Sequence, residues 1–182
     1  MWSYEELEAV AQRLRDHAEV REVAAVRNSD GLRYILIEPD GFSFGPALRD
    51  LVLDQVEPHN GTNVVAIVGS IPTDPDGTIN RENCVAIAEA LERTPIGLFR
   101  YEPPADQTEV ALVELLLEML PYQRISMTDN LPMLGADSLV IVELSAVLSE
   151  RFGVQVGAIE LFEVRDLRGL AARLAASMAL QG

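Results

Sequence analysis

The sequence predicts a small α+β domain followed by an all-α domain. Helical and strand-like apolar patterns alternate up to about residue 93, a proline-containing stretch without periodicity follows, and strand-like runs largely disappear after it. We therefore expect domains at residues 1–93 and 108–182, joined by a semi-rigid linker at residues 94–107.

The first domain begins with an amphipathic helix, in front of which Ser3 and Glu6 form a capping-box pattern. The segment Asn28-Ser29-Asp30-Gly31 separates two apolar runs and predicts a hairpin. The continuous apolar run VVAIV predicts a buried strand. The expected elements are a helix at 4–17, strands at 20–26 and 32–37, a helix at 46–56, a strand at 64–68, a loop at 71–82 and a helix at 82–93.

The second domain shows helical periodicity and a long loop. Leucines form one stripe of the first helix, and Gly153 follows the second helix, where glycine commonly ends one. The expected helices are 110–120, 138–152 and 166–178, with a short turn at 158–162. The loop at 121–137 is long for a compact domain, and such loops are often functional.

Composition excludes several classes of function. The 182 residues carry a net charge of −15, which argues against a nucleic-acid-binding surface. All 14 basic residues are arginine, so a lysine-containing phosphate-binding loop and Schiff-base chemistry are excluded. One cysteine and two histidines make a poor metal-ligand inventory, and we expect no metal site. The acidic start and the lack of a long apolar run predict a cytoplasmic protein that does not bind membranes.

The sharpest motif is Leu134-Gly135-Ala136-Asp137-Ser138-Leu139, where the long loop meets the second helix. A serine at a helix N-terminus can hold a negatively charged adduct near the positive end of the helix dipole. Gly135 permits a tight turn and a close approach by a modifying enzyme. Alternatively, Asp137 or Ser138 only caps the helix, because both residue types are common caps. Local sequence leaves both interpretations open.

From about residue 109 to 178 the chain resembles the acyl and peptidyl carrier proteins. The matching stretches are DNLPMLGADSLVIVEL, SERFGVQV and ELFEVRDLRGLAARL. The resemblance implies a four-helix carrier-protein bundle with 4′-phosphopantetheine attached to Ser138, next to Asp137. The first stretch is closer to fatty-acid and polyketide carriers and the last to peptide-synthetase carriers, so the cargo stays open.

The resemblance also implies where partner enzymes bind. Leu139, Val142 and Glu143 follow the serine, and they are the expected partner-binding residues. The alternatives are core packing for the two apolar residues and a solvated helix face for Glu143. Implied partners are a phosphopantetheinyl transferase, an adenylating enzyme in trans, and condensation, ketosynthase or tailoring enzymes.

Residues 5 to 93 resemble the small C-terminal subdomain of adenylating enzymes, as found in nonribosomal peptide synthetases. The matching pieces include EELEAVAQRLRDHAEVREVAAVR, LRDLVLDQVEP and VVAIVGSIPTDPDGTINRE. In that family a lysine in the last loop supplies positive charge to the active site. Thr78 occupies this position, and a threonine cannot supply that charge. The segment EPHNGTN also departs from the family pattern.

We therefore expect a carrier and not an enzyme, with a non-catalytic first domain that serves docking or structure. A second interpretation is that the first domain completes an adenylating enzyme whose larger domain is supplied in trans. A third is an interaction module in which Ser138 stays unmodified. Cys84 lies in an apolar helical pattern without a nearby histidine, and we expect it to be structural.

Overall fold

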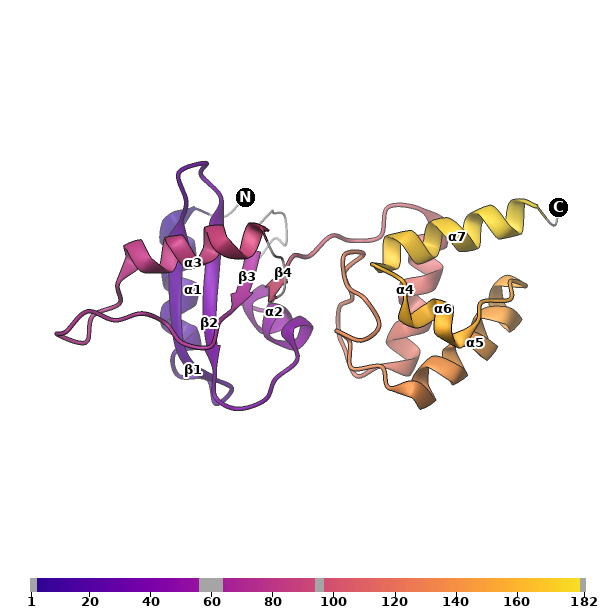
Figure 1. Cartoon of the computed structure of the whole chain (residues 1–182), viewed down its shortest axis with the longest axis horizontal. Coiled ribbons are helices and arrows are strands. Elements are labelled where there is room, and N and C mark those ends of the chain that lie inside the picture. Colours follow the sequence, from indigo (N-terminus) through magenta and orange to yellow (C-terminus); the bar gives the residue numbers. More distant parts are fainter. Residues whose placement is uncertain (1–2, 56–63, 94–96, 181–182) are drawn as a thin grey trace. The chain divides into compact units, whose positions relative to one another are not determined.

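The structure is a computed structural model that describes residues 3–55, 64–93 and 97–180. The chain divides into two compact units, residues 1–101 and 102–182, which Figure 1 shows in indigo to rose and in rose to yellow. Among the described residues, no helix is both long and apolar enough to cross a bilayer.

The first unit is a four-stranded sheet with helices on both faces. Strand order is β1-β2-β3-β4, with β1 and β2 antiparallel, β2 and β3 parallel, and β3 and β4 antiparallel. Its elements are α1 (Tyr4–Leu14), β1 (Val20–Arg27), β2 (Arg33–Pro39), α2 (Gly45–Leu53), β3 (Val64–Ile67), α3 (Arg81–Arg93) and β4 (Leu98–Phe99).

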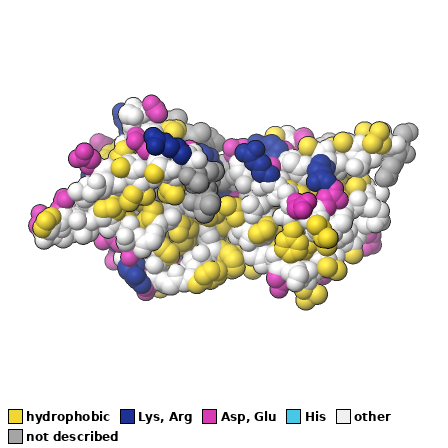
Figure 2. Space-filling model, in the orientation of Figure 1, with side chains coloured by type: hydrophobic (Ala, Val, Ile, Leu, Met, Phe, Trp, Pro, Cys, Tyr) yellow, Lys and Arg dark blue, Asp and Glu magenta, His cyan; other side chains and the backbone are white. Residues whose placement is uncertain are grey.

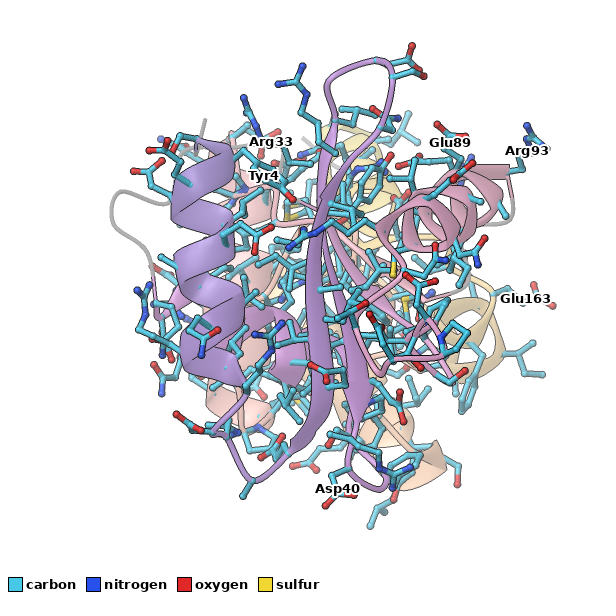
Figure 3. The ribbon with its side chains drawn as sticks, turned by 90° about the vertical axis from the view of Figure 1, so that its left-hand side faces the viewer. Tyr4, Arg33, Asp40, Glu89, Arg93 and Glu163 are labelled. Carbon is cyan, nitrogen blue, oxygen red and sulfur yellow. The ribbon has the colours of Figure 1, made fainter. Side chains whose placement is uncertain are left out.

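Burial on both faces explains why β2 is apolar throughout its centre. Tyr34 and Leu36 pack in one core cluster with Cys84 of α3, whereas Ile35 and Ile37 alternate with them and are also buried. Figure 3 shows the opposite placement of the two covering helices, with Tyr4 of α1 and the labelled residues of α3 on different sides of the sheet.

The second unit is helical and surrounds a core of its own. Its elements are α4 (Gln107–Met119), α5 (Ser138–Phe152), α6 (Ala158–Phe162) and α7 (Leu167–Ala179). Leucines from all four helices are buried in this core, together with loop residues such as Ile125 and Leu131. Gly153 ends α5 with a φ of 67°, the left-handed conformation expected of a glycine at this position.

The local signals in the sequence agree with the structure. Ser3 and Glu6 make both hydrogen bonds of the capping box in front of α1. The predicted hairpin joins β1 to β2, and Gly31 has a φ of 81°. α1 ends three residues before the expected position, since the backbone turns when His17 N–H donates to Leu14. The predicted helix 46–56 is α2, which begins one residue earlier, at Gly45, and ends at Leu53, since Asp54 and Gln55 form a turn. Residue 56 and the whole segment EPHNGTN lie outside the described residues.

The segment expected to be a linker at 94–107 contains folded structure. Leu98 and Phe99 form β4, an edge strand that pairs with β3. Two residues are too few to show a period in the sequence, which is why this strand was not expected. At the other end, Glu102 already belongs to the second unit, where its N–H donates a hydrogen bond to Ser126 Oγ. Residues 94–96 of the expected linker lie outside the described residues.

Candidate functional site

Ser138 is the first residue of α5 and follows a tight turn. The turn closes through hydrogen bonds from Gly135 N–H to the Pro132 carbonyl (3.0 Å) and from Ala136 N–H to the Leu131 carbonyl (3.0 Å). Gly135 has a φ of 73°, which a residue with a side chain rarely adopts, so glycine is required here. The turn thereby fixes where the helix begins and places Ser138 at its N-terminus.

Asp137, and not Ser138, caps α5. Its Oδ1 atom accepts hydrogen bonds from the backbone N–H groups of Leu139 (2.9 Å) and Val140 (3.0 Å). The side chain of Ser138 is exposed, and in the part of the chain that the structure describes its hydroxyl makes no hydrogen bond. Of the two alternatives for this motif, capping therefore applies to Asp137 and leaves the Ser138 hydroxyl free.

Apolar side chains on α5 are exposed immediately after the serine. Leu139 is 74% and Val142 58% exposed, and Glu143 is exposed beside them. Core packing, the alternative for these two apolar residues, is therefore excluded. The buried residues of the same helix are Ile141, Leu144 and Leu148, which follow a different face.

α6 adds two exposed apolar residues that are not among the expected partner-binding residues. Ile159 is 77% and Phe162 44% exposed, and α6 packs against α5. We name these four exposed residues, Leu139, Val142, Ile159 and Phe162, the α5–α6 apolar surface. Figure 2 shows hydrophobic side chains gathered on the visible face of the second unit. The segment 158–162 was expected to be a turn, but it forms a five-residue helix. The apolar residues Ile159 and Phe162 within it were the signal in the sequence that could have indicated this surface.

The long loop before Ser138 is held by buried polar contacts. Ser126 is fully buried, and its Oγ accepts a hydrogen bond from Glu102 N–H over 2.8 Å. Asp129 Oδ2 accepts from Ser126 N–H over 2.9 Å, and the Asp129 carbonyl accepts from Leu167 N–H over 2.8 Å. Arg168 of α7 pairs with Glu102 and with the buried Glu109 of α4. The loop is thus hydrogen-bonded to Glu102, ahead of α4, and to Leu167, the first residue of α7, and Arg168 joins these two segments.

Thr78 lies in an exposed turn of the first unit. Its backbone N–H and its hydroxyl both donate to Oδ1 of Asp76, over 3.0 and 2.7 Å. These bonds, the side-chain one first, lower the pKa of the Asp76 carboxyl. Asn80 Nδ2 donates to Oδ1 of Asp74 over 2.6 Å and closes the base of the turn. The side chain at position 78 is therefore neutral and bound within its own turn.

Cys84 is buried in α3, and burial raises the pKa of its thiol. A raised pKa lowers the thiolate fraction, which agrees with the expected structural role. Within the described ranges, no group of three or more histidine, cysteine, aspartate or glutamate side chains is arranged to hold a metal ion.

Comparisons with known proteins agree on the second unit. The family described as "Phosphopantetheine attachment site" matches residues 110–174, a range that contains Ser138 and α5. This family carries 4′-phosphopantetheine as its prosthetic group.

Most of the chain is similar to nonribosomal peptide synthetases. Malpibaldin synthetase of Mortierella alpina is 29% identical over 96% of this chain, and surfactin synthase subunit 1 of Bacillus subtilis (strain 168) is 26% identical over 91%. The chain spans only 3% and 5% of the lengths of these two relatives. Among solved structures, one described as McyG A-PCP complexed with phenylalanyl-adenylate matches 93% of this chain with 20% sequence identity and a TM-score of 0.40. The match covers 30% of the McyG chain. Residues 110–174 thus match the phosphopantetheine attachment family, and most of the chain is similar in sequence to segments of nonribosomal peptide synthetases.

Proposed function

We propose that the second unit is a carrier domain whose attachment residue is Ser138. The observation that supports this most directly is the free, exposed hydroxyl at the start of α5, whose cap is supplied by Asp137. A hydroxyl that the helix does not use is available as a nucleophile toward a phosphate donor. A phosphate on this residue also lies at the favourable, positive end of the helix dipole.

The site fits the prosthetic group of its family. When attached, 4′-phosphopantetheine supplies a terminal thiol that holds an acyl or aminoacyl group as a thioester. The residues of this chain position the attachment point: Gly135 shapes the turn and Asp137 starts the helix. The chain would tether such intermediates in nonribosomal peptide or hybrid polyketide biosynthesis in the cytoplasm.

The α5–α6 apolar surface is the proposed contact for partner enzymes, because exposed apolar side chains clustered in this way commonly mark interaction sites. Leu139 and Val142 adjoin the attachment residue, and Glu143 beside them would pair with a basic residue of the partner. The partners would be a phosphopantetheinyl transferase, an adenylating enzyme in trans, and condensation, ketosynthase or tailoring enzymes.

The first unit would be a non-catalytic docking or structural domain. The neutral Thr78 side chain, bound to Asp76, supports this, because adenylation requires positive charge near the reacting phosphate. The alternative function is completion of an adenylating enzyme in trans. Mixing the chain with candidate cores and measuring ATP–pyrophosphate exchange tests it. Exchange that depends on residues 71–80 would favour the alternative.

Intact-mass measurement after incubation with coenzyme A and a broad-range transferase tests the carrier assignment. We expect a mass gain of one phosphopantetheine in the wild-type chain and none in Ser138→Ala. Ser149→Ala is the matched control, because Ser149 lies on the same helix, and it should be modified fully. No gain in the wild type, or an equal gain in Ser138→Ala, would favour an unmodified interaction module instead.

A further inference from the structure

β1 is an edge strand of the first unit, and side chains cover part of its free edge. β1 pairs with β2 on one side only (Figure 1). In an antiparallel strand, alternate residues point their backbone N–H and C=O groups away from the neighbouring strand. At Val23 and Ala25, such groups bond to side chains and not to a strand. A free strand edge is a template for pairing with another chain, so this cover bears on assembly.

Two side chains from opposite faces of the sheet meet at the carbonyl of Ala25. Nη1 of Arg81, the first residue of α3, donates to this carbonyl over 2.9 Å. The hydroxyl oxygen of Tyr4, the first residue of α1, lies 3.2 Å from the same carbonyl oxygen and donates to Oε1 of Glu8 over 2.6 Å. Arg81 also pairs with Glu8. We name Tyr4, Glu8 and Arg81 the β1 clasp, because they join the starts of α1 and α3 around the strand edge.

A second cover lies two residues earlier on the same edge. The N–H of Val23 donates to Oε1 of Glu22 over 2.9 Å, and the Val23 carbonyl accepts from Nη2 of Arg15 over 3.5 Å. Arg15 and Glu22 are themselves paired over 3.2 Å. Two successive outward-facing residues of β1 are thus bonded to charged side chains. A strand that approaches this edge has to displace these side chains first.

Open space adjoins the β1 clasp, and its ion pair is exposed to solvent. A cavity of about 330 Å³, lined by Tyr4, Val26, Arg27, Arg81 and Val85, lies beside the C-terminal end of β1. The side chains of Arg81 and Glu8 are 52% and 33% exposed. Ion pairs as exposed as this contribute little to stability. Stability alone is therefore a poor explanation for a cluster that closes around a strand edge.

We propose that the β1 clasp prevents β1 from pairing with the β1 strand of a second copy of this chain. A second copy brings an identical strand of eight residues, and two identical edges can pair antiparallel in a closed two-fold dimer. Without the β1 clasp, the Ala25 carbonyl loses its side-chain donor and is open to the backbone of the second copy. The inference concerns the first unit and does not depend on the proposed carrier function of the second.

Sedimentation equilibrium of the full chain tests the proposal. Arg81→Ala removes the group that donates to the Ala25 carbonyl, and we expect its dimer association constant to be at least tenfold higher than that of the wild type. Arg93→Ala is the matched control, because Arg93 is an exposed arginine at the other end of α3. The control should associate as the wild type does.

Amide hydrogen exchange locates the contact. The N–H of Ala25 points to the free edge, so its exchange should slow at concentrations at which Arg81→Ala associates. Arg81→Met keeps the apolar stem and removes the guanidinium group; it should associate as Arg81→Ala does, and it keeps the test valid if Arg81→Ala does not fold. Unchanged association in the Arg81 variants, equal association in Arg93→Ala, or association without slower exchange at Ala25 would overturn the proposal.

Discussion

The hydroxyl of Thr78 donates a hydrogen bond of 2.7 Å to Oδ1 of Asp76. The same oxygen accepts the Thr78 backbone N–H over 3.0 Å, so the two residues form a self-contained polar turn. The exposed tip of residues 71–80 is thereby ordered by its own side chains and carries no cation at position 78.

Thr78→Val should raise the pKa of the Asp76 carboxyl toward its ordinary value, because the variant loses the side-chain hydrogen bond that is the first cause of the lowering. A carboxyl ¹³C titration measures this change. Thr73→Val is the matched control, since Thr73 is an exposed threonine of the same loop that makes no side-chain bond to Asp76. An unchanged Asp76 titration in Thr78→Val would contradict the described turn.

Asp137→Ala should lower the free energy of unfolding of the second unit by about 0.5–2 kcal/mol, because α5 loses its cap. Chemical denaturation followed by the helical circular dichroism signal measures the loss. Asp137→Asn keeps an oxygen acceptor. Because asparagine and aspartate are about equally good caps, this variant should lose much less stability than Asp137→Ala. Equal losses in the two variants would show that the carboxylate charge, and not the capping bond, stabilises the helix.

Val142→Ala should cost less than about 0.5 kcal/mol of stability, because exposed side chains away from special features contribute little. Leu144→Ala, two residues further on the same helix, should cost about 2–5 kcal/mol because Leu144 is fully buried. Under the proposed function, Val142→Ala should also slow modification by the transferase. A large loss of stability in Val142→Ala would show that the Val142 side chain packs in the core, and would contradict its exposure in the structure.

Ser126→Ala should cost about 1–3 kcal/mol, because it removes the acceptor for Glu102 N–H at a fully buried position. Ser149→Ala removes a hydroxyl that accepts a hydrogen bond from Gln155 Nε2 at the surface, and this variant should be close to neutral. Denaturant midpoints of the two variants measure the difference. Equal stability would mean that the segment at Glu102 is not held by this contact.

Two tyrosines of the first unit should ionise late. Burial, followed by the hydrogen bond to Glu8, raises the pKa of Tyr4 from 10.0 to about 12. Burial, followed by the hydrogen bond to Glu92, raises the pKa of Tyr34 to about 12. Because both pKa values are raised on folding, their stabilising contribution is complete below pH 10.0 and is lost as pH rises through about 12.

Absorbance of the phenolate during alkaline titration checks this prediction. Of the four tyrosines, two should remain neutral at pH values where all four ionise in the denatured chain. Tyr4→Phe and Tyr34→Phe should each remove one late-ionising group. Superimposable titrations of the folded and denatured chain would contradict the burial and hydrogen bonding of these two tyrosines.

Short-range signals made much of the fold predictable. The capping box of Ser3 and Glu6 and the hairpin at Asn28–Gly31 each depend on a few neighbouring residues. The position of Ser138 at the start of α5 follows in the same way from a glycine turn before an apolar helix. β4 was not predictable, because the pairing of Leu98 and Phe99 with β3 is a contact between distant segments.

Long-range packing determines which side chains of the candidate site are exposed, and the sequence alone does not show this. Leu139 and Val142 are residue types that usually lie in a core. Their exposure depends on which face of α5 the other helices cover. Ile159 and Phe162 were missed for the same reason, because a five-residue helix has too few turns to show a buried face. The choice of Asp137 over Ser138 as the cap required the side-chain geometry.

Under the proposed function, the division of tasks between Asp137 and Ser138 separates chemical modification from helix stability. Since α5 takes its terminal hydrogen bonds from Asp137, esterification of the Ser138 hydroxyl removes no bond from the described part of the chain. The unmodified and modified forms would therefore share one backbone conformation. A partner that distinguishes the two forms must then recognise the adduct itself, because the helix that presents it reports nothing about its state.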